Sequence, residues 1–310
     1  MVNRAVEVVH VGSACRDIAS DDPRGWRLGG GVTYAALTTA RLGLRTAAVV
    51  GVDPLAATAP ELDALRDAGV DILAVALPEG PIFHNIETPQ GRVQIAMAAG
   101  IPVRPVPLPD SWLRSRAWSL VPVADEVSDD WVEHIRPEAT VAVAWQGMLR
   151  RLIPGERVER VQPAERAILR RGDIIGMSHL DVDKDTTLGE LSRLLHPGAR
   201  LLVTTGGDGV TETLRYLPTA TENEVDPTGA GDTFLAALLT AFVRPRIGGV
   251  RSAASALRFA AAAGSLAVED VGLLGVPNRT EVLVRRAREH VRRTVVPSES
   301  AQVGVEDPRQ

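Results

Sequence analysis

At residues 224–234 the chain reads EVDPTGAGDTF, and an apolar run follows. The two glycines and the alanine at 229–231 stand where a helix over 230–243 is expected to begin. Small residues let backbone N–H groups approach an anion closely, and the N-terminus of a helix carries partial positive charge. An acid in the first turn, here Asp232, also stabilises an ordinary helix by about 0.3–1 kcal/mol. That role requires neither the glycines nor the second acid at Asp226, so the stretch predicts an anion-binding loop.

Upstream of this loop, short apolar segments alternate with segments of helical periodicity. The expected strands are residues 6–11, 46–52, 72–77, 117–121, 140–144, 174–177 and 200–204. The expected helices are a segment ending at Gly43, then residues 61–68, 129–135, 163–169 and 188–195, and finally 250–268. This alternation predicts an open, mostly parallel α/β sheet with helices on both faces.

One region breaks the alternation. Residues 83–88 and 92–98 are short alternating runs around a turn that contains Gly91, which is typical of a β-hairpin. We expect this hairpin to belong to a small β lid, whose pieces are residues 13–28, including a polar loop over 15–27, and residues 82–99. The other expected features are an extended proline-rich connector over 101–110, a hairpin-like stretch within 210–225, one domain over 1–295 and a disordered tail over 296–310.

Composition limits the class of protein. The chain has 310 residues and a formal net charge of −5, which disfavours a general nucleic-acid binder. Its one cysteine, Cys15, excludes a disulfide framework and a zinc site built on paired cysteines. The longest uncharged apolar stretch, 259–268, is too short to span a bilayer, and Glu7 and His10 argue against a signal peptide. We therefore expect a soluble cytoplasmic protein with no membrane partner.

Several common catalytic motifs are absent from the sequence. The one lysine, Lys184, follows Asp183, so there is no Walker A loop. The patterns Gly-x-Gly-x-x-Gly, Gly-x-Ser-x-Gly and His-Glu-x-x-His do not occur. These absences disfavour a simple dinucleotide-dependent dehydrogenase, an α/β-hydrolase and a zinc hydrolase.

Three motifs together resemble those of the ribokinase-like (PfkB) carbohydrate kinases. Asp-x-Thr-Gly-Ala-Gly-Asp over 226–232 is similar to the family's C-terminal signature. Gly29-Gly30, followed by Ala36 and Arg41-Leu42-Gly43, resembles its N-terminal signature. Residues 203–209, VTTGGDG, resemble the strand and loop that hold the nucleotide. The order and spacing of the motifs agree from about residue 6 to residue 272.

The resemblance implies ATP-dependent phosphorylation of an alcohol, with Mg²⁺ as cofactor. It implies that Asp232 is the general base and that Gly229, Ala230 and Gly231 form an anion hole. This division of roles fits the chemistry, because phosphoryl transfer needs positioning, charge stabilisation and a nearby base. The implied nucleotide-binding residues are Ser178, Thr204, Gly206, Gly207, Gly209, Thr228 and Gly229.

The implied acceptor site lies beyond the first strand. A carboxylate at Asp17 would hydrogen-bond hydroxyl groups, beside the bare backbone of Gly29 and Gly30, and each hydroxyl both donates and accepts. The other implied acceptor-binding residues are Tyr34, Asn85 on the hairpin and Gln146 after the strand 140–144.

The sequence departs from the family pattern at two places. Tyr34 stands where many members have asparagine, and its ring would stack on a ligand, narrow the pocket or belong to the core. Residues 178–181 read SHLD where the family has Asn-x-x-Glu, so we expect Asp181 to act on Mg²⁺ through water. Asp226 lies in a segment similar to one that binds potassium in some relatives, which implies a monovalent cation such as K⁺.

The sequence favours one function and leaves two alternatives open. Residues 29–34 (GGGVTY) and 146–150 (QGMLR) resemble a subgroup that includes myo-inositol kinases, so a cyclitol or sugar is expected. A nucleoside kinase of the same fold is the first alternative, with Trp26, Tyr34 and Phe83 as a base-stacking pocket. A nucleotide-binding regulatory protein with weak catalysis is the second. Larger lids of related proteins make dimer contacts, so a homodimer is open as well.

Overall fold

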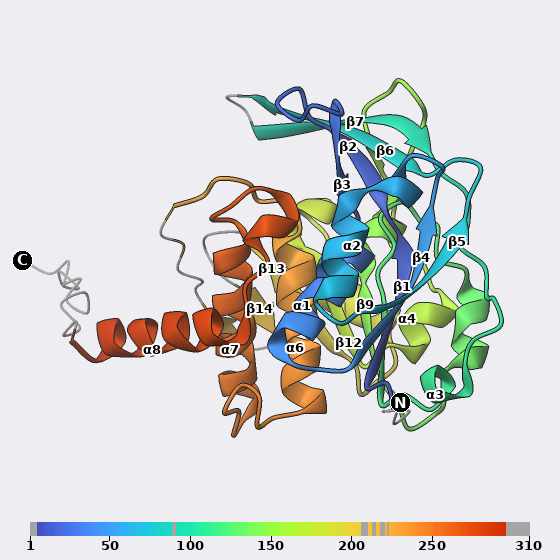
Figure 1. The fold of residues 1–310 in the computed structure, drawn as a ribbon. Coiled ribbons are helices and arrows are strands. Elements are labelled where there is room, and N and C mark those ends of the chain that lie inside the picture. The colour runs from blue at the N-terminus through green and yellow to red at the C-terminus, as the bar shows by residue number, and fades with distance from the viewer. Residues whose placement is uncertain are drawn as a thin grey trace, which may run out of the picture.

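A mostly parallel sheet runs through the computed structural model, which describes residues 5–88, 91–205, 210–212, 215–217, 221 and 223–295. Among these residues the sheet has nine strands, in the order β15-β14-β13-β12-β9-β8-β1-β4-β5 (Figure 1). The strands are β1 (Val8–Ser13), β4 (Thr46–Val52), β5 (Asp71–Ala76), β8 (Ala117–Leu120), β9 (Thr140–Ala144), β12 (Ile174–Ser178), β13 (Arg200–Thr204), β14 (Val210–Glu212) and β15 (Arg215–Leu217). Neighbours from β13 to β5 are parallel, and β14 and β15 add an antiparallel edge.

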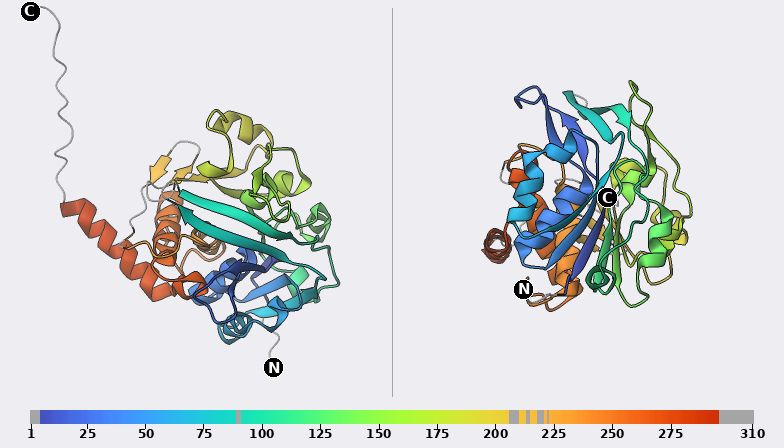
Figure 2. Two further views of the ribbon diagram at one scale, coloured as in Figure 1. Left: turned by 90° about the horizontal axis from the view of Figure 1, so that it is seen from above. Right: turned by 45° about the vertical axis from the view of Figure 1, so that its right-hand side comes forward.

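Helices cover both faces of this sheet (Figures 1 and 2). One core layer contains side chains of α1, α2, α6 and α7, and the other contains side chains of α3, α4 and α5 together with three buried tryptophans. The helices are α1 (Gly31–Leu42), α2 (Pro60–Asp67), α3 (Asp110–Leu113), α4 (Ala167–Arg171), α5 (Leu188–Arg193), α6 (Ala230–Val243), α7 (Ala253–Ala267) and α8 (Arg279–Val295). Strands β1 and β4 are buried along their whole length, as expected for a parallel sheet covered on both sides. The expected open, mostly parallel α/β sheet with helices on both faces is thereby confirmed.

A second sheet forms the lid, in the order β3-β2-β6-β7. Its strands are β2 (Cys15–Ile18), β3 (Trp26–Gly29), β6 (Pro81–Thr88) and β7 (Gly91–Ala99). The expected hairpin is confirmed, because β6 and β7 pair in antiparallel register. The expected polar loop over 15–27 is wrong, since much of it forms β2 and β3. Strand β2 owes its structure to neighbours on both sides, β3 and β6, and not to an apolar alternation that the sequence would reveal.

The lid is fastened to the body at two places. Arg16 of β2 donates from Nε to Oδ2 of the buried Asp53 at 2.8 Å. Arg24 donates to both carboxylate oxygens of Glu61, at 2.8 and 2.6 Å. Because Asp53 follows β4 and Glu61 belongs to α2, these pairs join the lid to the carboxyl-terminal edge of the main sheet.

A third chain segment completes the lid. The strands β10 (Arg150–Arg151) and β11 (Glu159–Arg160) pair with each other, and the chain between them runs along the outer edge of β7. The N–H of Gly155 donates to the carbonyl of Ala96 at 2.7 Å, and the N–H of Ala96 donates to Glu156 at 2.9 Å. Residues 150–160, called the edge segment below, therefore extend the lid sheet.

Other elements differ from the expected ones in detail. The expected helix over 129–135 is the 3₁₀ helix η2 (Asp129–His134), and the helix expected over 163–169 begins only at Ala167. The proline-rich connector is followed by the short helix α3, and α8 has no counterpart among the expected elements. The tail expected over 296–310 lies outside the described residues. Within the part of the chain that is described, no helix has both the length and the apolar character needed to cross a membrane.

Candidate active site

Asp232 lies in the first turn of α6, where the N-termini of two helices meet. Gly229 caps α6 with φ of 77°, a backbone conformation that favours glycine. A Cβ on Gly229 would lie 2.2 Å from the ring of Tyr34, so the anion-binding loop (229–231) tolerates no side chain there. A Cβ on Gly31, the first residue of α1, would lie 2.8 Å from Oδ1 of Asp232. The carboxylate therefore lies against bare backbone.

The Asp232 carboxylate is poised to accept a proton near neutral pH. Its pKa is raised to about 6, mainly by burial; the charge of Arg150 lowers the pKa and that of Asp181 raises it. No residue that the structure describes donates a hydrogen bond to it. A carboxylate with this pKa and free lone pairs is suited to act as a general base.

A chain of polar side chains in the lid includes Asp17 and Asn85, which the sequence predicts to bind the acceptor. Asn85 of β6 donates from Nδ2 to Oδ1 of Asp17 at 3.3 Å, and Gln94 of β7 donates to Oδ1 of Asn85 at 2.7 Å. Burial raises the pKa of Asp17 to about 6, and the charge of Asp226 adds to this effect. A Cβ on Gly29 would lie 2.3 Å from Oδ2 of Asp17, so the glycine makes room for the carboxylate.

Gly30 and Tyr34 shape the same region from α1. Gly30 precedes the helix with φ of 102°, and a Cβ there would lie 2.4 Å from the carbonyl oxygen of Ser13. Tyr34 is only 2% exposed, and its ring packs against Gly229. Burial raises the pKa of the phenol, as do the charges of Asp17 and Asp226. The ring thus supports the anion-binding loop, and a direct contact of Tyr34 with the acceptor stays a prediction.

Asp226 and Thr228 connect the anion-binding loop to the lid. Asp226 accepts from the N–H of Thr228 at 3.0 Å and from the N–H of Gly272 at 3.1 Å. Burial opposes ionisation of Asp226, but these hydrogen bonds outweigh it and hold its pKa below the usual value. Arg92 of β7 donates to Oγ1 of Thr228 at 2.9 Å and lies 3.5 Å from Oδ1 of Asp226. This group is called the clasp below.

Asp181 is engaged by protein groups at both oxygens. Its Oδ2 accepts from the N–H of Ser178 at 2.7 Å, and its Oδ1 accepts from Nε2 of Gln146 at 2.9 Å. The guanidinium of Arg150 lies 4.0 Å from the same Oδ1. Among the described residues no group of three or more acidic, histidine or cysteine side chains is arranged for a metal ion. The contact of Asp181 with Mg²⁺ through water stays a prediction.

The remaining expected residues divide into two sets. Ser178 and Thr204 end β12 and β13 and are register partners, so they lie side by side at the carboxyl edge of the sheet. Gly206, Gly207 and Gly209 lie outside the described residues. Arg92, Gln94 and Arg150 are site residues that the sequence reasoning did not assign. For Arg150 a signal exists, because it ends the QGMLR stretch, whereas nothing in the sequence singles out Arg92.

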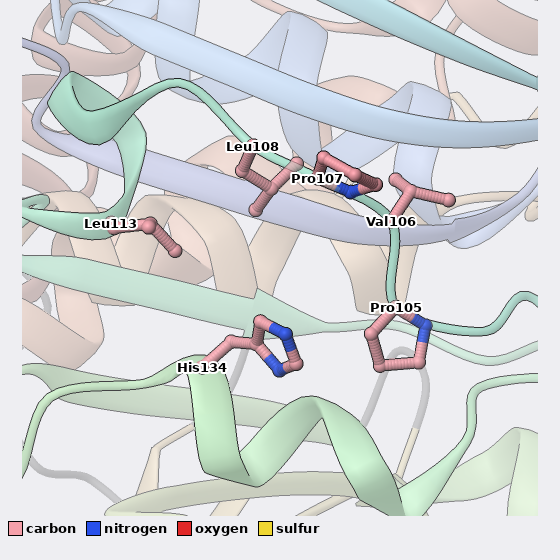
Figure 3. Close-up of a pocket in the computed structure, with 6 residues that line it drawn as sticks. All are labelled: Pro105, Val106, Pro107, Leu108, Leu113 and His134. Carbon is pink, nitrogen blue, oxygen red and sulfur yellow. The ribbon is translucent and has the colours of Figure 1, made fainter.

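A separate pocket lies on the proline-rich connector (Figure 3). Its walls are apolar apart from one imidazole, and its lining residues are Pro105, Val106, Pro107, Leu108, Leu113 and His134. It shares no residue with the site around Asp232.

Comparison with known proteins points to one group of kinases. Residues 177–279 match the profile described as pfkB family carbohydrate kinase. The chain is 28% identical over 241 residues to the cytidine kinase of Thermococcus kodakarensis, covering 70% of this chain and 79% of that protein.

Solved structures share the fold at low identity. A pyrophosphate-dependent kinase in the ribokinase family, complexed with a pyrophosphate analogue and myo-inositol, matches with a TM-score of 0.66 and 20% identity, over 89% of this chain and 98% of that one. The Arabidopsis thaliana ribokinase complexed with ribose and ATP matches with a TM-score of 0.67 and 21% identity, over 91% of this chain and 99% of that one.

Proposed function

We propose that this chain, a small-molecule kinase with the ribokinase-like fold and a pfkB family carbohydrate kinase match at residues 177–279, transfers the terminal phosphoryl group of ATP to a hydroxyl of a neutral polyol. The acceptor we favour is a cyclitol such as myo-inositol, or a sugar. The observation that carries the proposal is Asp232, a half-buried carboxylate with a pKa of about 6 and no hydrogen bond from a described residue, at the start of α6.

In the proposed reaction, the acceptor oxygen attacks the terminal phosphorus as its proton passes to the Asp232 carboxylate. The bond between that phosphorus and the bridging oxygen breaks, and ADP leaves. The first N–H groups of a helix have no acceptor within the helix, so those of Gly229 and Gly231 are proposed to donate to the phosphoryl oxygens. The N–H of Ala230 makes a long hydrogen bond of 3.4 Å to the carbonyl of Pro227, which it would exchange for a phosphoryl oxygen. The negative charge that develops there meets the positive end of α6.

The charge of the site supports a neutral acceptor. Its four acids, Asp17, Asp181, Asp226 and Asp232, outnumber its two arginines, Arg92 and Arg150. A sugar phosphate would add negative charge to this surplus, at a cost in binding free energy. Hydroxyl groups instead match the chain of Asp17, Asn85 and Gln94, which offers both donors and acceptors.

We propose that ATP, the phosphoryl donor, is bound by Ser178, Thr204 and Thr228 together with the glycines at 206, 207 and 209. Mg²⁺ would arrive on the donor phosphates, neutralise part of their charge, and reach Asp181 through water. We also propose that the Asp226 carboxylate lies next to a bound monovalent cation such as K⁺. Equal rates of phosphorylation in sodium and potassium buffers would contradict this cation site.

The test is product formation across a panel of acceptors. The panel contains myo-inositol, scyllo-inositol, ribose, fructose, fructose 6-phosphate, adenosine and cytidine, each with MgATP or with magnesium pyrophosphate as donor. We expect one neutral polyol to be phosphorylated from MgATP. Fructose 6-phosphate as the best acceptor would overturn the neutral-acceptor proposal, and turnover with pyrophosphate alone would overturn the choice of ATP.

A nucleoside acceptor is the second candidate, favoured by the similarity to the Thermococcus cytidine kinase. The aromatic side chains speak against it. Tyr34 and Phe83 are each 2% exposed, and the Trp26 ring is covered by the guanidinium groups of Arg24 at 4.6 Å and Arg16 at 5.6 Å. Tyr34 and Phe83 therefore offer little ring surface to a base, and the arginines compete with a base for the Trp26 ring, so we expect cytidine turnover to require a rearrangement of this pocket.

A further inference from the structure

We propose that Arg150 binds the phosphoryl group during transfer, and that Asp181 serves to hold this arginine in place. The proposal rests on the proposed kinase function and adds a catalytic residue to it. Arg150 follows the 3₁₀ helix η3 (Trp145–Leu149), which continues from the carboxyl end of β9. It therefore starts at the edge of the sheet where open α/β folds bind their ligands.

The guanidinium of Arg150 lacks partners for most of its hydrogens. The side chain is only 21% exposed, and its ion pair with Oδ1 of Asp181 is 4.0 Å long, too long for a hydrogen bond. Among the residues that the structure describes, none accepts a hydrogen bond from it. A guanidinium has five N–H donors, and a largely buried cation without hydrogen bonds is costly. Both facts call for an anionic ligand at this point.

Asp181 is built to orient a side chain. It is 6% exposed and fixed at both oxygens, by the N–H of Ser178 and the amide of Gln146. A carboxylate fixed in this way holds Arg150 from one side and leaves the other donors of the guanidinium free. Arg150 and Asp181 both lie close enough to Asp232 for their charges to affect the pKa of the Asp232 carboxylate.

This arrangement explains the departure at residues 178–181. The sequence pattern leads one to expect a carboxylate that serves the metal, but the hydrogen bonds of Asp181 go to Ser178 and Gln146. An arginine supplies a fixed positive charge with a fork of donors that matches phosphate geometry. The guanidinium of Arg150 thus supplies part of the positive charge that a metal ion bound by a carboxylate would otherwise bring.

The position of Arg150 also couples it to the lid. It begins the edge segment, which is hydrogen-bonded to β7 through Ala96. A phosphoryl group gripped by Arg150 therefore contacts a part of the chain that is continuous with the lid sheet.

The experiment compares Arg150→Gln and Arg150→Lys with Arg151→Gln, a matched control on the same strand whose side chain is 65% exposed. Binding of MgATP and of inorganic pyrophosphate is measured by calorimetry, and kcat and KM are measured with the acceptor found in the panel. We expect Arg150→Gln to lose about tenfold or more in pyrophosphate affinity and at least about 10²-fold in kcat, with an acceptor KM within about threefold of wild type. Arg150→Lys should recover part of both, and Arg151→Gln should match wild type.

The role of Asp181 is tested by Asp181→Asn. We expect a reduced kcat that excess Mg²⁺ does not restore; full rescue by Mg²⁺ would assign Asp181 to the metal instead. Unchanged kcat and pyrophosphate affinity in a folded Arg150→Gln variant would overturn the role of Arg150 while leaving the kinase proposal intact. If no acceptor is turned over, the affinities still decide the matter, because wild-type protein that binds neither probe overturns both proposals.

Discussion

The anion-binding loop and the lid are built in opposite ways. The loop draws its main groups, three backbone amides and the Asp232 carboxylate, from four consecutive residues at one helix start. The lid takes its strands from three separate stretches of chain, and its polar contacts join residues far apart, such as Asp17 with Asn85. In the proposed function, transfer chemistry is therefore local in the sequence, whereas acceptor recognition is assembled by folding. The two regions should respond differently to substitution.

The largest effect is expected at the loop. Asp232→Asn removes the proposed base while keeping the shape of the side chain, so kcat should fall at least about 10²-fold with MgATP affinity retained. Steady-state kinetics and calorimetry measure the two quantities. Glu224→Gln, an exposed change in the same stretch, is the control. A kcat close to wild type in Asp232→Asn would remove this carboxylate from the mechanism.

A substitution in the lid should affect binding more than turnover. Asp17→Ala deletes a proposed acceptor of hydrogen bonds from the substrate and leaves Nδ2 of Asn85 without its acceptor. We expect the KM for the acceptor to rise about 10–100-fold, the range for a hydrogen bond to a charged group, with nearly unchanged ATP affinity. Asp21→Ala, whose side chain is 71% exposed on the same lid, is the control. Equal weakening of acceptor and ATP would place Asp17 outside the acceptor site.

We expect a lower pH to reduce activity, through protonation of Asp232, before the protein unfolds. Asp232 must be ionised to take a proton, and its pKa in the folded protein is about 6. We therefore expect kcat/KM to be near its plateau above pH 7 and to fall as the pH drops through 6, to about a tenth of the plateau at pH 5. A pH profile of kcat/KM, which reports the pKa of the free enzyme, measures this, with circular dichroism at each pH as the control for folding. A profile that stays flat to pH 5 would contradict the raised pKa.

The smallest of these effects is expected at the clasp, where the two regions meet. Arg92→Gln removes the donor that ties β7 to Thr228 and the nearby charge at Asp226. The tie is half-exposed, so we expect a rise of about three- to fivefold in acceptor KM and little change in ATP affinity. Arg27→Gln, in β3 of the same lid, controls for loss of a lid charge. A change larger than that of Asp17→Ala would mean that Arg92 contacts a substrate directly.

The contrast between local and long-range contacts also explains which elements could be predicted from the sequence and which could not. Strand β4 and helix α6 match the expected bounds to the residue, because elements whose apolar residues are largely buried show their pattern directly. Strands β2 and β3 were expected as loop, since their stability comes from pairing with each other and with β6. Asp17 and Asn85 were each expected in the site, but their hydrogen bond spans 68 positions and no local pattern encodes it.

The roles of the arginines are hidden for a related reason. Arginine makes up 33 of the 34 basic residues of the chain, so its presence at one position carries little information. What distinguishes Arg150 is the lack of hydrogen-bond partners among the described residues, and what distinguishes Arg92 is a partner 136 positions away. Both properties exist only in the folded chain.

The cover of Trp26 by two guanidinium groups has an optical consequence. The other tryptophans, at 112, 118, 131 and 145, lie buried in the body, so Trp26 is the indole of the lid. Its two arginines are the same ones that fasten the lid to Asp53 and Glu61. Any movement that breaks those pairs also changes the charges over the ring. The lid thus carries its own fluorophore, and we expect its contribution to the emission to change when these pairs break.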